Sequence, residues 1–210
     1  NPTNAKLGAI TEHTLEICTP LADITVLEWG TDIIAATNSS SHGGTWAAKY
    51  AVNGGGMVSA DEHGSWGTPG DGTPEHSWMA DGILGNWIQF DFARPYRLAE
   101  MWVWNGSYKY RLFGGSIKGC TIEYYDGLAW QTLMTTELAS WDGSSPYQRT
   151  DVISFGRVTA EKVRLNTLST YGSEDVILSE VRFYVSVNPT PPVCTPYSGA
   201  LETESPAVLD

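Results

Sequence analysis

The chain has 210 residues, with nine Trp, 22 Gly and 11 Pro, and only 17% of its residues are charged. This composition suits short strands joined by elaborate loops better than it suits helices. The net charge of −12 argues against nucleic acids and anionic membranes as partners, because the field of the protein would repel both. No apolar run is long enough to span a bilayer, so we expect no direct membrane insertion.

The chain opens with a segment that has no evident core of its own. Only Ile24–Leu27 has weak strand character, and we interpret residues 1–28 as an N-terminal extension. After a short strand at Ile33–Ala36, the glycines of Asn53–Gly56 require tight backbone geometry. The residues between Met57 and Gly85 form a long loop, and such loops are usually functional or held by a ligand.

Two strands are predicted at the centre of the chain. Apolar residues alternate with polar ones in Ile88–Phe92 and with tryptophans in Met101–Trp104. Pro95 has no amide hydrogen to donate, so we expect the ladder to break between the two strands. So many aromatic and β-branched residues can be covered only by a second sheet, which predicts a β-sandwich.

The second half of the chain continues the strand pattern. Asp126-Gly127 is typical of the turn of a hairpin. We assign residues 29–187 to one domain and the Pro-rich residues 188–210 to a C-terminal tail or linker. The later strands are expected at Cys120–Tyr124, Trp130–Leu133, Val152–Phe155, Lys162–Asn166 and Leu178–Tyr184.

Two of the three cysteines flank the predicted domain in matching Cys-Thr-Pro settings. Cys18 lies before it and Cys194 after it, and sandwich termini often lie close together. We therefore predict a Cys18–Cys194 disulfide and an extracellular protein. The alternative is that both are free or bond to another chain. Cys120 is interpreted as a small buried hydrophobic residue.

These motifs together resemble the discoidin family, also called coagulation-factor type C, which includes carbohydrate-binding module family 32. The resemblance runs from about Asp32 to Tyr184 and includes Asn86–Phe92, Met101–Asn105 and Leu178–Phe183. It implies an all-β fold, a discoidin-like jelly-roll β-sandwich of the galactose-binding-domain type, here with N- and C-terminal extensions. Such domains are accessory modules of secreted enzymes, adhesins or surface proteins, with ligands bound by loops at one end.

Sugar binding requires an aromatic face for the C–H surface of the ring, and polar groups that bond its hydroxyls. The spacing of His63 and Trp66 resembles the His-x-x-Trp of some galactose-binding members. Arg111 lies in the loop after the central strand, where such modules often place an Arg or Asn. For each aromatic residue the alternative is packing against its own loop. The predicted ligand-binding residues are His63, Trp66, Tyr108, Tyr110, Arg111 and Tyr171.

The resemblance also implies a structural calcium ion, between the loop matching Ala51–Gly56 and Glu180. Calcium prefers such hard oxygen ligands. Asn53 stands where the family has Asp, and Asp61 could restore the missing charge. The predicted metal ligands are thus Asn53, Asp61 and Glu180, and the alternative is that Glu180 only bonds loop amides.

Catalysis has little support in the sequence. No Gly-x-Ser-x-Gly or His-Glu-x-x-His motif is present. Spacing alone leaves open a metallohydrolase built from one loop, and the alternative is a solvated loop. The residues concerned are Asp61, Glu62, His63, Asp71, Glu75 and His76.

We therefore predict a non-catalytic, extracellular module for glycan adhesion in a larger secreted or surface protein. Its expected ligand is a neutral glycan such as a galactose-type sugar. The alternative is a structural subunit or adhesin domain of an extracellular assembly. In that case loops and tail strands would contact neighbouring protein subunits.

Overall fold

The computed structural model describes residues 16–18, 24–64, 76–82, 85–106, 114–144, 146–186 and 194–196. The chain divides into two compact units, Ile24–Val187 and the two tails, Asn1–Asp23 with Asn188–Asp210. The larger unit begins at Ile24, earlier than the predicted boundary at residue 29, because β2 (Ile24–Val26) pairs with β13 (Glu180–Ser186). Within the described ranges, no helix has the length and apolarity needed to cross a membrane.

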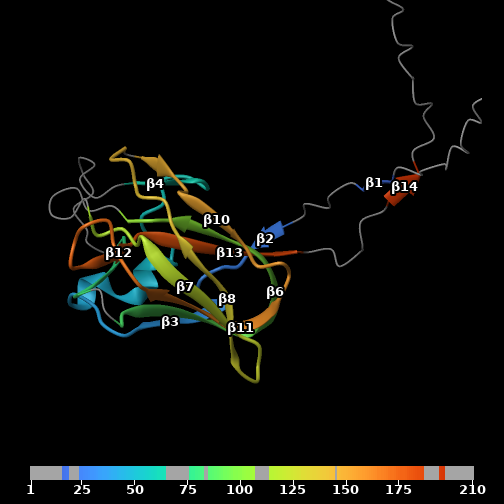
Figure 1. Ribbon diagram of the computed structural model, residues 1–210, viewed down its shortest axis with the longest axis horizontal. Coiled ribbons are helices and arrows are strands. Elements are labelled where there is room, and N and C mark those ends of the chain that lie inside the picture. The colour runs from blue at the N-terminus through green and yellow to red at the C-terminus, as the bar shows by residue number, and fades with distance from the viewer. Residues whose placement is uncertain are drawn as a thin grey trace, which may run out of the picture. The chain divides into compact units, whose positions relative to one another are not determined.

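One long strand organises the larger unit. β6 (Trp87–Trp104) is continuous and curves through the domain (Figure 1), so the prediction of two separate strands was wrong. Its first half pairs with β3 (Ile33–Asn38) and β11 (Thr159–Thr167), and its second half pairs with β10 (Asp151–Ser154) and β13.

Pro95 lies where β6 changes partners. The register with β11 shifts between Ala160, opposite Tyr96, and Lys162, opposite Asp91. The residues between Asp91 and Tyr96 thus fall in an irregular part of the ladder, where the missing amide hydrogen of a proline costs little. Pro95 therefore marks the bend of a shared strand instead of ending it.

The two halves of β6 belong to two sheets that face each other. The first continues through β11 to the hairpin of β7 (Gly119–Tyr125) and β8 (Trp130–Glu137), which confirms the predicted turn at Asp126-Gly127. The second consists of β2, β13, the end of β6 and β10. Between the two sheets the rings of Phe90 and Phe183 pack edge to face, with their centres 5.3 Å apart. They lie in the core of a jelly-roll β-sandwich.

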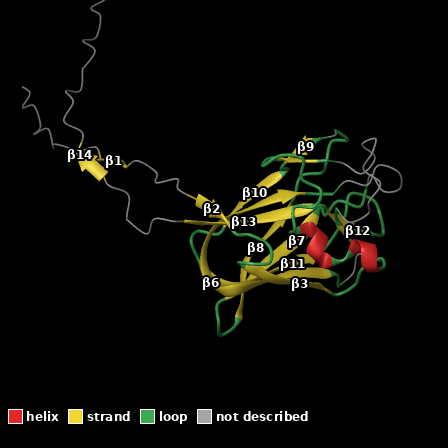
Figure 2. Cartoon of the chain, turned by 180° about the vertical axis from the view of Figure 1, so that it is seen from behind, coloured by secondary structure: helices red, strands yellow, loops and turns green. Residues whose placement is uncertain are grey.

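The remaining elements are short. Figure 2 shows the 3-10 helices of the described residues in red among the green loops. In the described residues of the smaller unit, β1 (Glu16–Cys18) pairs antiparallel with β14 (Cys194–Pro196). The other elements are η1 (Gly44–Trp46), η2 (Ala48–Ala51), the pair β4 (Glu62–His63) with β9 (Tyr147–Gln148), and the pair β5 (Trp78–Ala80) with β12 (Val176–Leu178).

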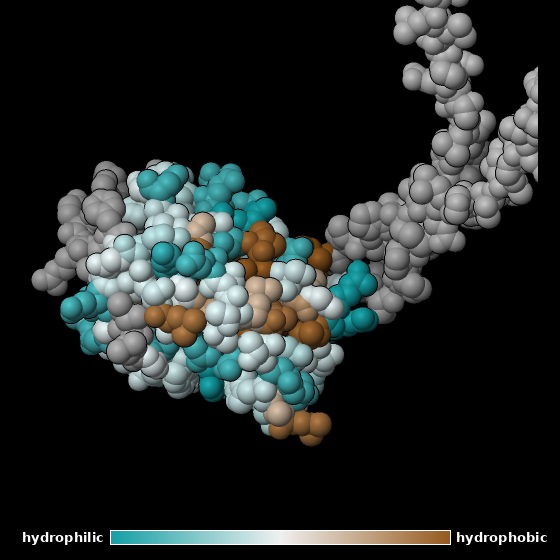
Figure 3. Space-filling view, viewed as in Figure 1, coloured by the Kyte–Doolittle hydropathy of each residue, from teal (hydrophilic) through white to brown (hydrophobic). Residues whose placement is uncertain are grey.

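Because β6 doubles back, it begins and ends at the same end of the sandwich, which we call the loop end. β13 starts there, since Glu180 pairs with Trp104, and β10 starts there, since Asp151 pairs with Val103. The bend of β6 lies at the opposite end. On the surface, hydrophobic colour gathers in separate patches, one of them at the tip of the β7–β8 hairpin (Figure 3), where Leu128 is 89% exposed.

Candidate functional site

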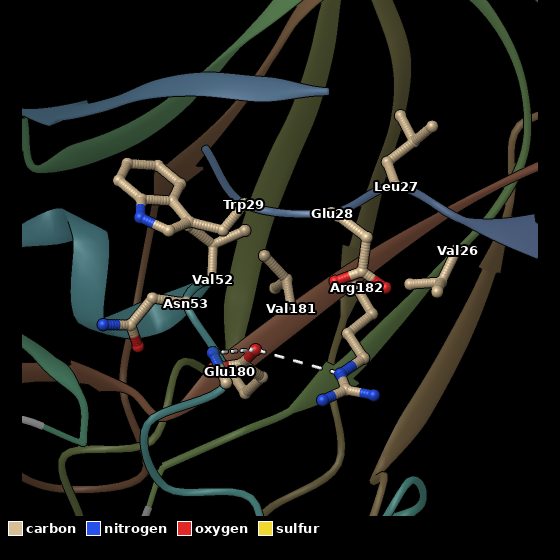
Figure 4. A pocket seen from close by; sticks show the side chains of 10 residues that line it. Val26, Leu27, Glu28, Trp29, Val52, Asn53, Glu180, Val181 and Arg182 are labelled. Carbon is tan, nitrogen blue, oxygen red and sulfur yellow. Dashed lines mark hydrogen bonds and ion pairs between the residues drawn. The ribbon is translucent and has the colours of Figure 1, made fainter. Parts of the chain in front are cut away.

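The start of β13 places a carboxyl group inside the loop end. Glu180 is 1% exposed, and its Oε1 accepts a hydrogen bond from the backbone N–H of Gly54 at 3.0 Å. The Nε of Arg182 lies 3.9 Å from the same oxygen (Figure 4). Oε2 is buried and has no hydrogen-bond partner among the described residues. Burial raises the pKa of Glu180 to about 8, although Arg182 and the Gly54 N–H oppose the shift.

A cavity of about 160 Å³ lies beside Glu180. Its walls come from the last residue of β2, Val26, with the following residues 27–29, from residues 52–54 and from the start of β13. The orphan oxygen of Glu180 fits a cation, because a buried carboxylate needs a positive or hydrogen-bonding partner. The bond from Gly54 also shows that Glu180 holds the loop through an amide, which was the predicted alternative to metal binding.

The other two predicted metal ligands are engaged elsewhere. The Oδ1 of Asn53 accepts a hydrogen bond from the N–H of Gly55 at 2.9 Å, and its amide points away from Glu180 in Figure 4. The carboxylate of Asp61 is exposed and lies 3.3 Å from the Nη1 of Arg149. Of the three predicted metal ligands, Glu180 is therefore the one with a buried side-chain oxygen that has no hydrogen-bond partner among the described residues.

His63, predicted to contact a ligand, is a core residue with 1% exposure. Its Nε2–H donates to the carbonyl of His76 at 3.2 Å, and its ring lies 5.5 Å from that of Tyr147. Burial lowers the pKa of His63 to about 4. The imidazole is thus neutral at physiological pH, and it is covered from any ligand at the surface.

We expect His63 to make the stability of the protein pH-dependent. Its pKa is about 4 in the folded chain against an ordinary value of 6.5, so the unfolded chain takes up the proton first as the pH falls. The neutral His63 therefore makes its full contribution to the free energy of unfolding above pH 6.5. This contribution, about 3 kcal/mol, is lost as the pH falls from about 6.5 to about 4. Urea unfolding at pH 7 and pH 4.5 should show a smaller pH effect in His63→Gln than in the wild type. Equal pH effects would contradict this assignment.

Most of the predicted sugar contacts lie outside the described residues, namely Trp66, Tyr108, Tyr110 and Arg111, as do Asp71 and Glu75 of the metallohydrolase alternative. Tyr171 is described and is 41% exposed. Its hydroxyl donates to the carbonyl of Leu138 at 2.7 Å, and the Nζ of Lys118 lies 5.9 Å from its ring centre. Its ring is therefore held at the surface of the loop end.

A pocket that the sequence analysis missed lies between Ala139 and Thr150. Its volume is about 290 Å³. The indole of Trp141 and the ring of Tyr147 lie 5.9 Å apart beneath it, in a small second core with Trp104. A tryptophan followed by the turn-rich residues 142–146 was the only sign of it in the sequence. The polar side chains of its lining are those of Ser140, Asp142, Ser144, Gln148, Arg149 and Thr150.

Arg149 is the basic residue in the lining of this pocket. Its guanidinium lies 3.8 Å over the centre of the Trp102 ring and is paired with Asp61. Both contacts hold a long side chain in one place, which reduces the entropy lost when it binds a ligand. The pocket lining thus combines Arg149 with amide, carboxylate and hydroxyl side chains, the kinds of group that bond the hydroxyls of a small polar ligand.

Comparison with known proteins identifies the family of this chain. The family model of the F5/8 type C domain matches residues 35–181, and the chain belongs to this family. The F5/8 type C domain of a Bacteroides fragilis protein is 14% identical with a TM-score of 0.57, covering 79% of this chain and 98% of that one. No curated protein matches the sequence.

Two further solved structures share the fold. The module CBM32-3 from a family 31 glycoside hydrolase of Clostridium perfringens is 18% identical with a TM-score of 0.50, covering 76% of this chain and 94% of that one. The chitosan-binding module 1 derived from a chitosanase/glucanase of Paenibacillus sp. IK-5 is 19% identical with a TM-score of 0.50, covering 71% and 92%. The predicted discoidin-like jelly roll is confirmed.

Proposed function

We propose that this chain is a non-catalytic carbohydrate-binding module of a larger secreted or surface protein, acting outside the cell. The pocket at residues 139–150 is the observation that carries this proposal. Its cavity is of monosaccharide scale, and it combines aromatic walls with guanidinium, amide, carboxylate and hydroxyl groups. The solved relative whose name records chitosan binding supports the same class of ligand.

The ligand we propose is a neutral glycan, with galactose-type sugars as the first class to test. The net charge of −12 disfavours polyanionic glycans, because charge repulsion would slow and weaken their binding. Trp66, Tyr108, Tyr110 and Arg111 stay predicted contacts. Gly64 is the last described residue before Trp66, and Gly106 is the last described residue before Tyr108, Tyr110 and Arg111. Gly106 follows the end of β6 at the loop end.

Replacing Arg149 tests this function. We expect Arg149→Ala to weaken binding of galactose or a galactose-terminated oligosaccharide at least about tenfold in calorimetric titration, since it loses a charged hydrogen-bond donor. Arg97→Ala is the matched control, because the Nε of Arg97 bonds the carbonyl of Arg157 away from the pocket. Equal affinities of both variants and the wild type would rule out the pocket as the sugar site.

We also propose a structural calcium ion at Glu180. Glu180 and Asn53 would hold it, which requires the Asn53 amide to turn from Gly55. The ion would link the loop at 53–56 to the start of β13. Asp61 would add a negative charge to the calcium site only if its carboxylate gave up the ion pair with Arg149.

Chelation tests the metal. An ion that binds only the folded chain stabilises it by about 2.7 kcal/mol at a hundredfold excess over its Kd. Calcium should therefore raise the Tm of the EDTA-treated wild type but not that of Glu180→Gln. Glu62→Gln, which changes a partly exposed carboxylate in β4, should keep the response. A wild-type Tm that does not respond to calcium would contradict the site.

A further inference from the structure

The outward face of the first sheet has features of a ligand-binding surface. Within β6 and β11 the residues Ile88, Phe90, Val163 and Leu165 are fully buried, so the alternate residues point to the opposite side of the sheet. We call this opposite side the sheet face. It displays Trp87, Gln89, Asp91, Thr121, Glu123, Tyr125, Trp130, Thr132, Lys162, Arg164 and Asn166, which pair across the strands in register.

Arg164 occupies the centre of the sheet face, between two indole rings. Its guanidinium carbon lies 4.1 Å from the ring centre of Trp130 and 4.9 Å from that of Trp87. The side-chain Oε1 of Gln89 accepts hydrogen bonds from the Nη2 of Arg164 at 2.7 Å and from the Nε of Arg164 at 3.2 Å. These contacts restrict the motion of Arg164 and of both tryptophans.

The polar side chains around this centre are fixed by one another. The Nε2 of Gln89 donates to Asp91 at 2.6 Å, and the Nζ of Lys162 lies 3.2 Å from the other oxygen of that carboxylate. Asn166 donates to Glu123 at 2.8 Å. Two basic and two acidic side chains thus balance, although the whole chain carries a charge of −12.

The sheet face remains accessible. Trp87, Glu123 and Trp130 are partly exposed, and Thr132 is exposed. Beyond Asp91 and Lys162 it leads to a hollow of about 320 Å³ at the bend of β6, lined also by Ile34 and Arg94. A ligand lying across the strands could therefore extend past the aromatic pair.

We propose that the sheet face binds a stretch of neutral polysaccharide, as a second contact separate from the pocket at the loop end. Indole edges and faces suit the C–H surfaces of sugar rings, and the amide, carboxylate and hydroxyl groups between them suit sugar hydroxyls. Local charge balance favours a neutral chain over a charged partner. Fixed side chains reduce the entropy cost of binding. This inference rests on the proposed carbohydrate-binding function and extends it to a longer ligand.

Affinity electrophoresis through gels containing soluble galactan, mannan, xylan or β-glucan tests the sheet face. We expect at least one polysaccharide to retard the wild type, and Trp130→Ala to weaken that interaction about tenfold or more. Thr132→Arg, at an exposed position of the same face, should weaken it by obstruction even if Trp130→Ala fails to fold. Leu128→Ala, at the nearby hairpin tip, is the matched control and should behave as the wild type.

Calorimetric titration with free galactose separates this proposal from the loop-end pocket. Galactose binding should be at least about tenfold weaker in Arg149→Ala and unchanged in Trp130→Ala. If Arg149→Ala leaves galactose binding intact while retardation still depends on Trp130, the sheet face stands and the pocket fails. If Trp130→Ala and Thr132→Arg migrate as the wild type in every gel, or no gel retards the wild type, the sheet face is overturned.

Discussion

Reducing the predicted Cys18–Cys194 disulfide is expected to lower the free energy of unfolding by up to about 5 kcal/mol, because such a bond would close most of the chain into one loop. In the β1–β14 pair, Cys18 lies directly opposite Cys194. Directly opposed residues of antiparallel strands have Cα atoms about 4.5–5.5 Å apart, within the range that a disulfide spans. The disulfide remains a prediction that this register supports.

Urea unfolding with and without a reductant measures the effect. The double variant Cys18→Ser/Cys194→Ser should be as unstable as the reduced wild type and should not respond to the reductant. Cys120 is free and buried, and burial raises the pKa of its thiol to about 12, so it should not exchange in the folded chain. A non-reducing peptide map without a Cys18–Cys194 pair would contradict the prediction.

Gly56→Ala should destabilise the larger unit by about 4 kcal/mol or more, the scale of a severe core mutation. A Cβ at this position would lie 2.1 Å from the Nε2 and 2.4 Å from the Cε1 of His63. The buried ring cannot move aside without losing its bond to His76. Gly44→Ala is the matched control, because its Cβ would meet no atom within 4 Å. Thermal unfolding of both variants measures the difference.

A double-mutant cycle assigns this effect to the contact with His63. Removing the ring in His63→Ala leaves a cavity and costs stability by itself, but it also makes room for a methyl group at position 56. The double variant should therefore be more stable than the sum of the two single effects predicts. Simple additivity would show that Gly56→Ala acts through another contact.

The fold was predictable because its strands alternate so clearly. Ile88, Phe90 and Phe92 point to the core, as the spacing indicated. Pro95 led to the wrong prediction of two separate strands, since a break in pairing and a change of partner look the same in one sequence. Ile24–Val26 was taken for part of the extension because so short a strand is stabilised mainly by pairing with β13.

The site was harder to predict, because its contacts join distant segments. Asp61 looked like a metal ligand in its own loop, but Arg149 from a loop far along the chain neutralises it. His63 looked like a surface histidine in a polar segment, and its burial depends on Gly56 and on the pairing of β4 with β9. The hydrogen bond from the backbone N–H of Gly54 to Glu180 was foreseen only because the family resemblance linked the two segments.

The tails bear on the rival function. In the part of the tails that the structure describes, β1 and β14 pair with each other. This pairing lies within one chain, so assembly through tail strands of neighbouring subunits stays a prediction. Light scattering of the purified chain would detect self-association. A stable oligomer that is lost when residues 1–23 are removed would favour a structural subunit.

A glycan array probed with the full chain tests the central claim most directly. We predict that the wild type, loaded with calcium, binds at least one neutral glycan, and that Arg149→Ala binds it at least about tenfold more weakly while Arg97→Ala does not. A folded wild-type chain that binds no neutral glycan on the array and is retarded by no polysaccharide in gels would contradict the assignment of this domain as a carbohydrate-binding module.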